Sequence, residues 1–432
     1  MLASSFRIDD AAQATIAVAA LAAAELLLLR TGRRQRVSVD RRHAAVEFRS
    51  ERHLRVAGAP PPETWDSMAG LYSTEDGWVR LHTNFPHHRA GVLRLLNASD
   101  RDTVAAALLR RRAMAFEDEA ANAGLCVTAL RNFDAWDAHP QGWAVSDRPV
   151  RIEWIGDAPP QALPSLPRPL GGVRVLDLTR IIAGPVAGRT LAVHGADVLA
   201  ISAAHLPSIP ALVMDAGRGK LSAQLDLRGL DGRARLEALA READVFVQGY
   251  RPGALASFGF SDAALAALRP GIVTASLSAY GESGPWRNRR GFDSLLQTAS
   301  GFNVAEAEAA GQATPRPLPA QALDHASGYL LAFGIMTALH RRATVGGSWR
   351  VAVSLAATGR WLRGLGRVHD GLSATELRHG DVADLLEETE SGFGPLTAVR
   401  HAARMFDTPA AWERPSVPLG THEAVWPARG TM

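Results

Sequence analysis

Two long runs of small apolar residues shape the pattern of the chain. They occupy 10–39 and 324–353, and both begin with Asp and pass through a glycine into a short Val-x-Val segment. Each copy predicts a helix of about five turns, a turn and a strand. A weaker echo relates 150–159 to 399–409. We therefore interpret the chain as two incomplete copies of one architecture.

We assign the first copy to residues 1–40. The pattern of the following residues, 41–165, predicts a small α+β domain. Strands are expected at 77–82 and 125–130, and helices at 92–96 and 104–121. A proline-rich segment, 158–169, ends this part of the chain. Proline fixes φ and lacks an N–H group, so this segment is predicted to be an extended linker and a domain boundary.

From Gly172 onward, short apolar strands alternate with helices, which is typical of a parallel sheet covered on both faces. Strands are predicted at 173–176, 198–201, 222–227, 245–247 and 272–277, with helices at 229–242 and 262–268. The expected fold class is α/β, a Rossmann-like doubly wound parallel sheet over 169–360 beside the smaller α+β domain. Residues 361–432 are expected to form a C-terminal extension. No G-x-G-x-x-G follows the first strand, which disfavours a dinucleotide cofactor.

Composition narrows the class of protein. With 432 residues, 47% of them hydrophobic and 21% charged, the chain is expected to be globular with two or three domains. No cluster of Lys and Arg indicates nucleic-acid binding. Cys126 is the only cysteine, which excludes an intrachain disulfide and favours a reducing, cytoplasmic location. The apolar stretch 16–29 is short for a membrane span and contains Glu25, so we interpret it as a core helix.

Eight short motifs follow one another within 169–360. They are 171–185, 195–198, 218–222, 225–227, 243–245, 250–253, 280–286 and 290–293. In order and spacing they resemble the class III CoA-transferases, the CaiB/BaiF family, a superfamily that includes formyl-CoA transferase, carnitine CoA-transferase and α-methylacyl-CoA racemase. The resemblance implies an acyl-CoA and a small carboxylic acid as partners, CoA thioester as substrate with no tightly bound cofactor, and a homodimer.

The order of the two domains departs from that family. Residues 77–141 resemble the small domain that normally follows the catalytic helix, yet here they precede the Rossmann-like part. The chain is therefore predicted to be rearranged, as a permuted protein or a remnant of a tandem fusion.

The resemblance implies that Asp324 is catalytic, since the family's nucleophilic Asp begins the helix after the Rossmann-like part. Its carboxylate is expected to form an acyl anhydride and then an aspartyl thioester with CoA, and the helix N-terminus favours its anion. The alternative is a helix cap. Asp10 holds the equivalent place in the first copy, and we interpret it as a vestige or a cap.

The same resemblance implies a set of CoA-binding residues. They are Ile181, Ile182, Ala183, Arg218, Lys220, Tyr250, Arg251, Arg290 and Asp293. Many family members have a polar residue, often Gln, at the position of Ile182, so its side chain supplies no hydrogen bond here. Each group has a structural alternative. Residues 181–183 are then apolar residues that end a buried strand, the cations at 218 and 220 lie on a solvated face, and residues 250–253 form an Arg-Pro-Gly turn.

Two other functions stay open at this point. In the racemases of the family a His takes the place of Phe292, and phenylalanine accepts no proton, although His325 is a potential substitute. A catalytically inactive CoA-binding scaffold is the other alternative. The irregularly spaced His82, His87 and His88 are interpreted as surface histidines and not as a metal site.

Overall fold

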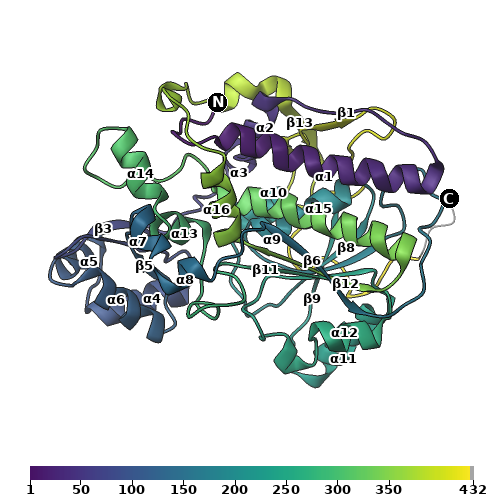
Figure 1. The fold of residues 1–432 in the computed structure, drawn as a ribbon, viewed down its shortest axis with the longest axis horizontal. Helices are drawn as coiled ribbons and strands as arrows, with labels where there is room; N and C mark the ends of the chain where they lie inside the picture. The colour runs from purple at the N-terminus through teal and green to yellow at the C-terminus, as the bar shows by residue number, and fades with distance from the viewer. Residues whose placement is uncertain (429–432) are drawn as a thin grey trace.

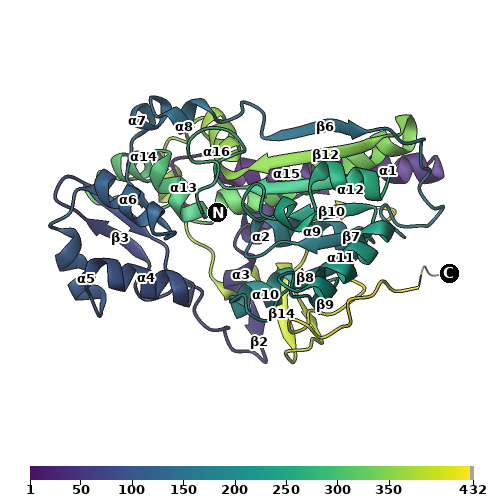
Figure 2. The same cartoon turned by 90° about the horizontal axis from the view of Figure 1, so that it is seen from below.

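A seven-stranded sheet forms the centre of the computed structural model, which describes residues 1–428 (Figures 1 and 2). In spatial order its strands are β6 (Val150–Gly156), β12 (Ser348–Ser354), β11 (Val273–Ser278), β10 (Val245–Gln248), β7 (Arg174–Leu178), β8 (Asp197–Ser202) and β9 (Lys220–Gln224). The six strands from β9 to β12 are parallel, and β6 pairs antiparallel with β12. The parallel part has the 3-2-1-4-5-6 order of a doubly wound sheet, which confirms the predicted α/β class.

Helices cover both faces of this sheet. One face carries α9 (Ala183–Val193), α10 (Pro210–Ala216) and α15 (Ala322–Val345), and the other carries α11 (Leu230–Glu242) and α12 (Asp262–Leu268) (Figure 1). Successive side chains of a strand point to opposite faces. In β10, for example, Val245 and Val247 pack into the core under α15, whereas Phe246 packs against α11. The strands are apolar on both faces because neither face meets water.

The internal repeat is visible in the structure. Helix α1 (Ile8–Thr31) and α15 are both 24 residues long, and they lie side by side (Figure 1). Helix α15 leads to β12, which pairs with β6, whereas α1 leads to β1 (Val37–Val39), which pairs with β15 (Ala403–Met405). The weaker echo therefore supplies the antiparallel partner strand in both copies. By length and composition alone α1 is apolar enough to cross a membrane, and half of its most apolar stretch is buried in the protein.

The small domain packs at one end of the large sheet (Figure 2). It contains a sheet of β3 (Gly70–Ser73), β4 (Trp78–Leu81) and β5 (Val127–Ala129), with α4 (Pro86–Leu96), α5 (Arg101–Leu108) and α6 (Ala113–Asn122). These elements bury a core of their own. The single helix expected over 104–121 is two helices, α5 and α6.

Three segments differ from the expected domain boundaries. Strand β6, predicted to lie within the small domain, extends the large sheet. Helices α2 (Arg41–Glu47) and α3 (Ser50–His53) lie against the large domain, where α2 packs on α1 and α3 contacts α10. Residues 361–428 also reach the N-terminal part of the chain, because β14 (Leu396–Val399) pairs with both β13 (Leu386–Thr389) and β2 (Arg55–Val56).

Short elements connect these units. They are α7 (Phe133–Asp137), α8 (Pro140–Trp143), α13 (Asp293–Ala299), α14 (Phe302–Ala309), α16 (Leu355–Gly364) and the 3₁₀ turns Ala256–Phe258, Gly371–Ser373 and His379–Leu385.

Candidate active site

Asp324 lies where two cavities meet. It is the third residue of α15, not its N-cap, which is Gln321. The larger cavity measures about 560 Å³ and the smaller about 460 Å³. Four residues line both: Ile181, Ile182, Phe292 and Asp324. Asp324 is buried, with 7% of its surface exposed, yet its side chain faces space that a ligand can fill.

The larger cavity opens at the carboxyl ends of β7 and β10, where the strand order reverses and α/β sheets bind ligands. Six of the nine predicted CoA-binding residues line it: Ile181, Ile182, Ala183, Tyr250, Arg251 and Arg290. Its lining is strongly basic, with Arg180, Arg251, Arg287, Arg289 and Arg290. Asp324 is the one carboxylate among its lining residues in the described part of the chain. The cavity is therefore suited to an anionic ligand.

The smaller cavity is formed largely by a segment that carries no recognisable motif. Glu51, Arg52 and residues 60–65 line it, including the half-exposed Trp65. Three carboxylates, Glu51, Glu63 and Asp324, line this cavity. Arg52 is the one arginine among its lining residues within 1–428. Sequence reasoning missed this wall. The only signal was a run of charged residues at 49–53 followed by three prolines.

Polar contacts with the Asp177 carboxylate and the Lys220 ammonium group hold the loop after β7. Asp177 accepts hydrogen bonds from the Thr179 backbone N–H at 3.0 Å and from Lys220 Nζ at 3.0 Å. Lys220 also donates to the Pro185 carbonyl at 2.8 Å. The loop holds Ile181 at φ +75°, a conformation that costs a β-branched residue about 1–3 kcal/mol. Such strain persists only where the surroundings fix it, and here it lies beside Asp324.

Two of the predicted CoA-binding cations occupy other places. Lys220 is buried by its ion pair with Asp177, and it lines neither cavity that contains Asp324. Arg218 is also buried, and it donates to the Asp215 carboxylate at 3.1 Å and to the Val399 carbonyl at 2.8 Å. Neither is placed to meet phosphates in the basic cavity. We assign both a structural role, because burial removes a cation from solvent unless acids and carbonyls compensate it.

Asp293 lies behind Asp324 and lines neither cavity. It is fully buried at the start of α13, and its Oδ2 accepts the Asp324 backbone N–H at 2.9 Å. Burial raises the pKa of Asp293 to about 6. Burial, together with the charges of Asp293 and Glu51, raises the pKa of Asp324 well above its usual range. The expectation of a readily ionised Asp324 is therefore wrong, since desolvation outweighs the helix N-terminus.

Phe292 separates the two cavities and stacks on His82, with ring centroids 3.8 Å apart. His82 and His88 are buried, so the prediction of surface histidines holds only for the exposed His87. His325 lines neither cavity. Its ring stacks on Phe48, and its Nε2 lies 3.4 Å from Glu51 Oε2. The site thus contains no histidine in the place where the racemases need a base.

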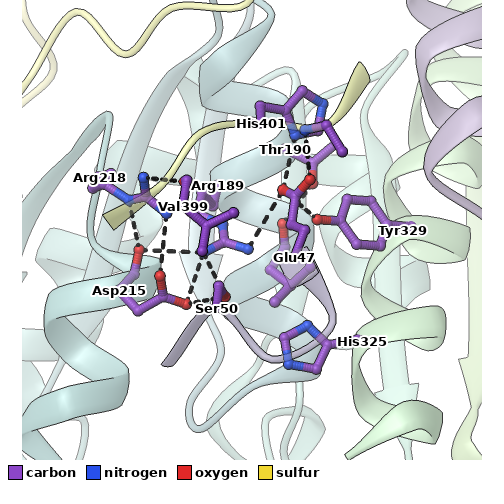
Figure 3. Close-up of polar contacts among 12 residues, drawn as sticks. Glu47, Ser50, Arg189, Thr190, Asp215, Arg218, His325, Tyr329, Val399 and His401 are labelled. Atoms are coloured by element: carbon purple, nitrogen blue, oxygen red, sulfur yellow. Dashed lines mark hydrogen bonds and ion pairs between the residues drawn. The ribbon is translucent and has the colours of Figure 1, made fainter. Parts of the chain in front are cut away.

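A buried polar network fixes the N-terminal wall of the site to the large domain (Figure 3). Glu47 accepts hydrogen bonds from Tyr329 Oη at 2.6 Å, His401 Nδ1 at 2.9 Å and the Ala402 backbone N–H at 2.6 Å. Burial raises a carboxyl pKa, but His401, Arg189 and Tyr329 outweigh it and hold the pKa of Glu47 below its usual range.

The same network continues to Asp215, which accepts from Arg189 at 2.7 Å and from Ser50 Oγ at 2.7 Å (Figure 3). Ser50 directly precedes Glu51 of the smaller cavity. The network therefore ties the wall of the site to α9, α10 and α15, the helices that surround Asp324.

The distance between α9 and α15 depends on Gly328. A Cβ atom at this position would lie 2.5 Å from the Ala183 carbonyl oxygen and 2.8 Å from the Val186 side chain. We expect Gly328→Ala to push the first turn of α9 away from Asp324, because a backbone oxygen cannot rotate aside. Shifts near 1 Å cost enzymes about 100-fold in rate, so transfer should fall by about that factor.

The matched control is Gly364→Ala, since a Cβ there meets no atom within 4 Å. Circular dichroism and steady-state transfer kinetics compare the two variants. Equal activity of both variants would show that the spacing of α9 and α15 does not govern the site.

Asp10, the equivalent of Asp324 in the first copy, lies on the surface. Its side chain is one-third exposed and pairs with Arg7 at 3.1 Å and Arg41 at 2.9 Å. It lines neither cavity described above. Asp10 is the third residue of α1 and not its cap, because the N-cap is Arg7, so of the two interpretations a vestige fits these contacts.

Comparison with known proteins gives one family match. Residues 170–379 match the model of CoA-transferase family III. The acetyl-coenzyme A transferase nodX of Hypoxylon pulicicidum is 35% identical over 47% of this chain and 35% of its own length. The probable fatty acyl-CoA transferase Rv3272 of Mycobacterium tuberculosis is 34% identical over 40% of this chain and 47% of its own length.

A third relative matches more of the chain. An acyl-CoA transferase of Gibberella moniliformis is 28% identical over 74% of this chain and 64% of its own length. The crystal structure of Rv3272 superposes with a TM-score of 0.42 at 31% identity, over 46% of this chain and 59% of that one. The chain thus spans between about one-third and two-thirds of the relatives that it matches.

Proposed function

We propose, because residues 170–379 match the model of CoA-transferase family III, that the chain moves CoA from an acyl thioester to a free carboxylate. Asp324 is the proposed nucleophile. The observation that carries this proposal is the position of Asp324 at the meeting point of a basic cavity and a second, separate cavity. A transferase needs both, one for CoA and one for the acid that is exchanged.

The basic cavity suits CoA. CoA carries a diphosphate and a 3′-phosphate, and arginines bind such groups through paired charge-assisted hydrogen bonds. Arg251 and Arg287 are exposed and form no ion pair with other residues of 1–428, so both are available to phosphates. The pantetheine arm would then run between Ile181, Ile182 and Phe292 toward Asp324. The acyl group and the acceptor would use the smaller cavity.

The proposed chemistry begins at Asp324 Oδ. Its carboxylate attacks the thioester carbonyl carbon, the C–S bond breaks, and CoA leaves as the thiolate, so that a mixed anhydride of Asp324 and the acyl group forms. The thiolate then attacks the aspartyl carbonyl carbon and releases the first acid as its carboxylate. The acceptor carboxylate attacks the carbonyl carbon of the resulting aspartyl thioester, the C–S bond breaks, and a second anhydride and the CoA thiolate form. The thiolate finally attacks the acceptor's carbonyl carbon in that anhydride. This last step regenerates the Asp324 carboxylate.

Backbone amides supply the proposed stabilisation of the oxyanions. Helix α9 begins at Ala183, which lines the basic cavity, and the first-turn N–H groups of a helix have no partner within the helix. Such donors stabilise negative charge that develops on a carbonyl oxygen. They would replace the side-chain donor that Ile182 lacks.

Arg251→Gln tests the role of the basic cavity. Removing one charged hydrogen-bond donor should raise the KM for acyl-CoA about tenfold or more, with a smaller change in kcat. The matched control is Arg94→Gln, an exposed arginine on α4 outside the basic cavity. Initial rates at several salt concentrations measure both effects. An unchanged KM in Arg251→Gln would remove the basic cavity from the proposal.

The pH dependence tests the ionisation of Asp324. The first step needs the carboxylate, and the pKa of Asp324 is raised by burial, Asp293 and Glu51. The kcat/KM for acyl-CoA should therefore rise with pH through a value above the ordinary Asp pKa of about 4. Asp293→Asn keeps an acceptor oxygen for the Asp324 N–H but removes a negative charge, so the acid limb should move to lower pH. An acid limb that stays in place would contradict this positioning role.

We also propose that the chain works as a homodimer in a reducing cytoplasmic compartment. Sedimentation equilibrium at several protein concentrations tests the assembly state.

A further inference from the structure

A second basic site lies on the far side of Arg52 from the proposed catalytic cavity. It is a groove of about 580 Å³ between α3 and the segment 375–381. The residues that line it are Arg49, Arg52, His53, Arg55, Thr375, Glu376, Leu377, Arg378, His379 and Asp381. Four arginines thus face two carboxylates. Of these residues, Arg52 also lines the smaller cavity beside Asp324.

The cationic groups of the groove are only partly neutralised. Glu376 forms an ion pair with Arg49 and a looser one with Arg52 at 4.0 Å. The guanidinium of Arg55 donates only to the backbone carbonyls of Arg52 and Leu54. The Arg378 side chain has no ion pair with another residue of 1–428. Two guanidinium groups therefore face the groove without an acid to neutralise them.

Buried donors in the groove also lack partners. His53 is 5% exposed, and its ring makes no hydrogen bond with any residue of the described chain. Its Nδ1 is buried without a partner, as are Arg49 Nε and His379 Nδ1. Buried polar atoms are normally hydrogen-bonded, and each exception requires an explanation. Three such atoms therefore gather in the wall of this one groove.

We propose that this groove is a binding site for a phosphate-bearing small molecule. Phosphoryl oxygens accept paired hydrogen bonds from guanidinium groups, and four arginines around one space provide such donors in several directions. Arg49 and His53 are buried, so their side chains are held in place before the ligand arrives. This lowers the entropy cost of binding. The groove volume exceeds that of a single phosphate, so a diphosphate or a phosphorylated metabolite fits the site better.

The experiment is isothermal titration of the full chain with inorganic pyrophosphate and, separately, with inorganic phosphate, in a buffer without other multivalent anions. We expect the groove to bind pyrophosphate with an affinity that falls as salt is added, in addition to any binding in the basic cavity beside Asp324. The double variant Arg55→Gln/Arg378→Gln should weaken pyrophosphate binding by at least about tenfold. The matched control is Arg110→Gln, an exposed arginine of the small domain.

Arg378 is exposed and Arg55 is half-buried with hydrogen bonds to backbone carbonyls only, so the double variant is expected to fold, and circular dichroism checks this. Titration with CoA distinguishes the source of the phosphate. Competition between CoA and pyrophosphate that disappears in the double variant would show that the groove holds a phosphate of CoA itself. Simultaneous binding of both would show a separate ligand. Absence of binding by all three probes, or equal pyrophosphate affinity in the double variant and the wild type, would overturn the proposal.

Discussion

Asp324→Asn should lower transfer of CoA at least about 1,000-fold, because the amide cannot form the anhydride with the acyl group. The same change should preserve the fold, since Asn has the shape of Asp. The hydrogen bond from the backbone N–H of residue 324 to the Asp293 carboxylate also stays unchanged. Chromatographic detection of the product thioester measures the activity. The matched control is Asp10→Asn, which alters the equivalent residue of the first repeat and should leave transfer unchanged.

Stability gives an independent signature of the same residue. Burial places the folded-state pKa of Asp324 above the value in the unfolded chain. Its contribution to stability is therefore full below a pH of about 4 and is lost as the pH rises through the folded-state pKa. Asp324→Asn lacks this loss, so its melting temperature at a pH of about 8 should equal or exceed that of the wild type. A large drop in melting temperature would instead indicate that Asp324 serves the fold.

Glu47→Ala should destabilise the protein by about 3–5 kcal/mol, the cost of breaking a buried ion-pair network by removing one partner. Tyr329, His401 and Arg189 would all lose the oxygen that they share (Figure 3). Urea unfolding followed by circular dichroism measures the change. The control is Glu390→Ala, an exposed glutamate of the C-terminal part. A loss below about 1 kcal/mol, as is usual for surface pairs, would contradict the role assigned to this network.

The pH dependence of that network has a defined sign. The folded-state pKa of Glu47 lies below its value in the unfolded chain, so its stabilisation is present above a pH of about 4. It is lost as the pH falls toward the folded-state pKa. The difference in stability between the wild type and Glu47→Ala should therefore shrink in acid.

Local patterns predicted the helices and strands well where one face or both faces are apolar. The copies at 10–39 and 324–353 predicted two similar helices, and α1 and α15 have equal length. The pattern did not predict that β1 pairs with β15 outside the large sheet, or that β6 belongs to the large sheet. Strand pairing depends on contacts between residues far apart in the chain, which hydrophobic periodicity does not record.

The candidate site was predicted on one side only. The loops after β7 and β10 carry family motifs, and they brought Ile182 and Arg251 into the basic cavity with Asp324. Glu51 and Trp65 have no motif, and only the tertiary fold brings them to Asp324. Arg218 shows the opposite error, because a cation in a motif was taken as a ligand contact although its partners are buried acids and carbonyls.

Trapping the covalent intermediate tests directly whether Asp324 is the nucleophile. The chain is mixed with an acyl-CoA, quenched with hydroxylamine or borohydride, digested and analysed by mass spectrometry. We expect the modification to lie on Asp324 and to be absent from Asp324→Asn. Transfer of CoA with an unmodified Asp324, or an adduct on a different carboxylate, would contradict this expectation.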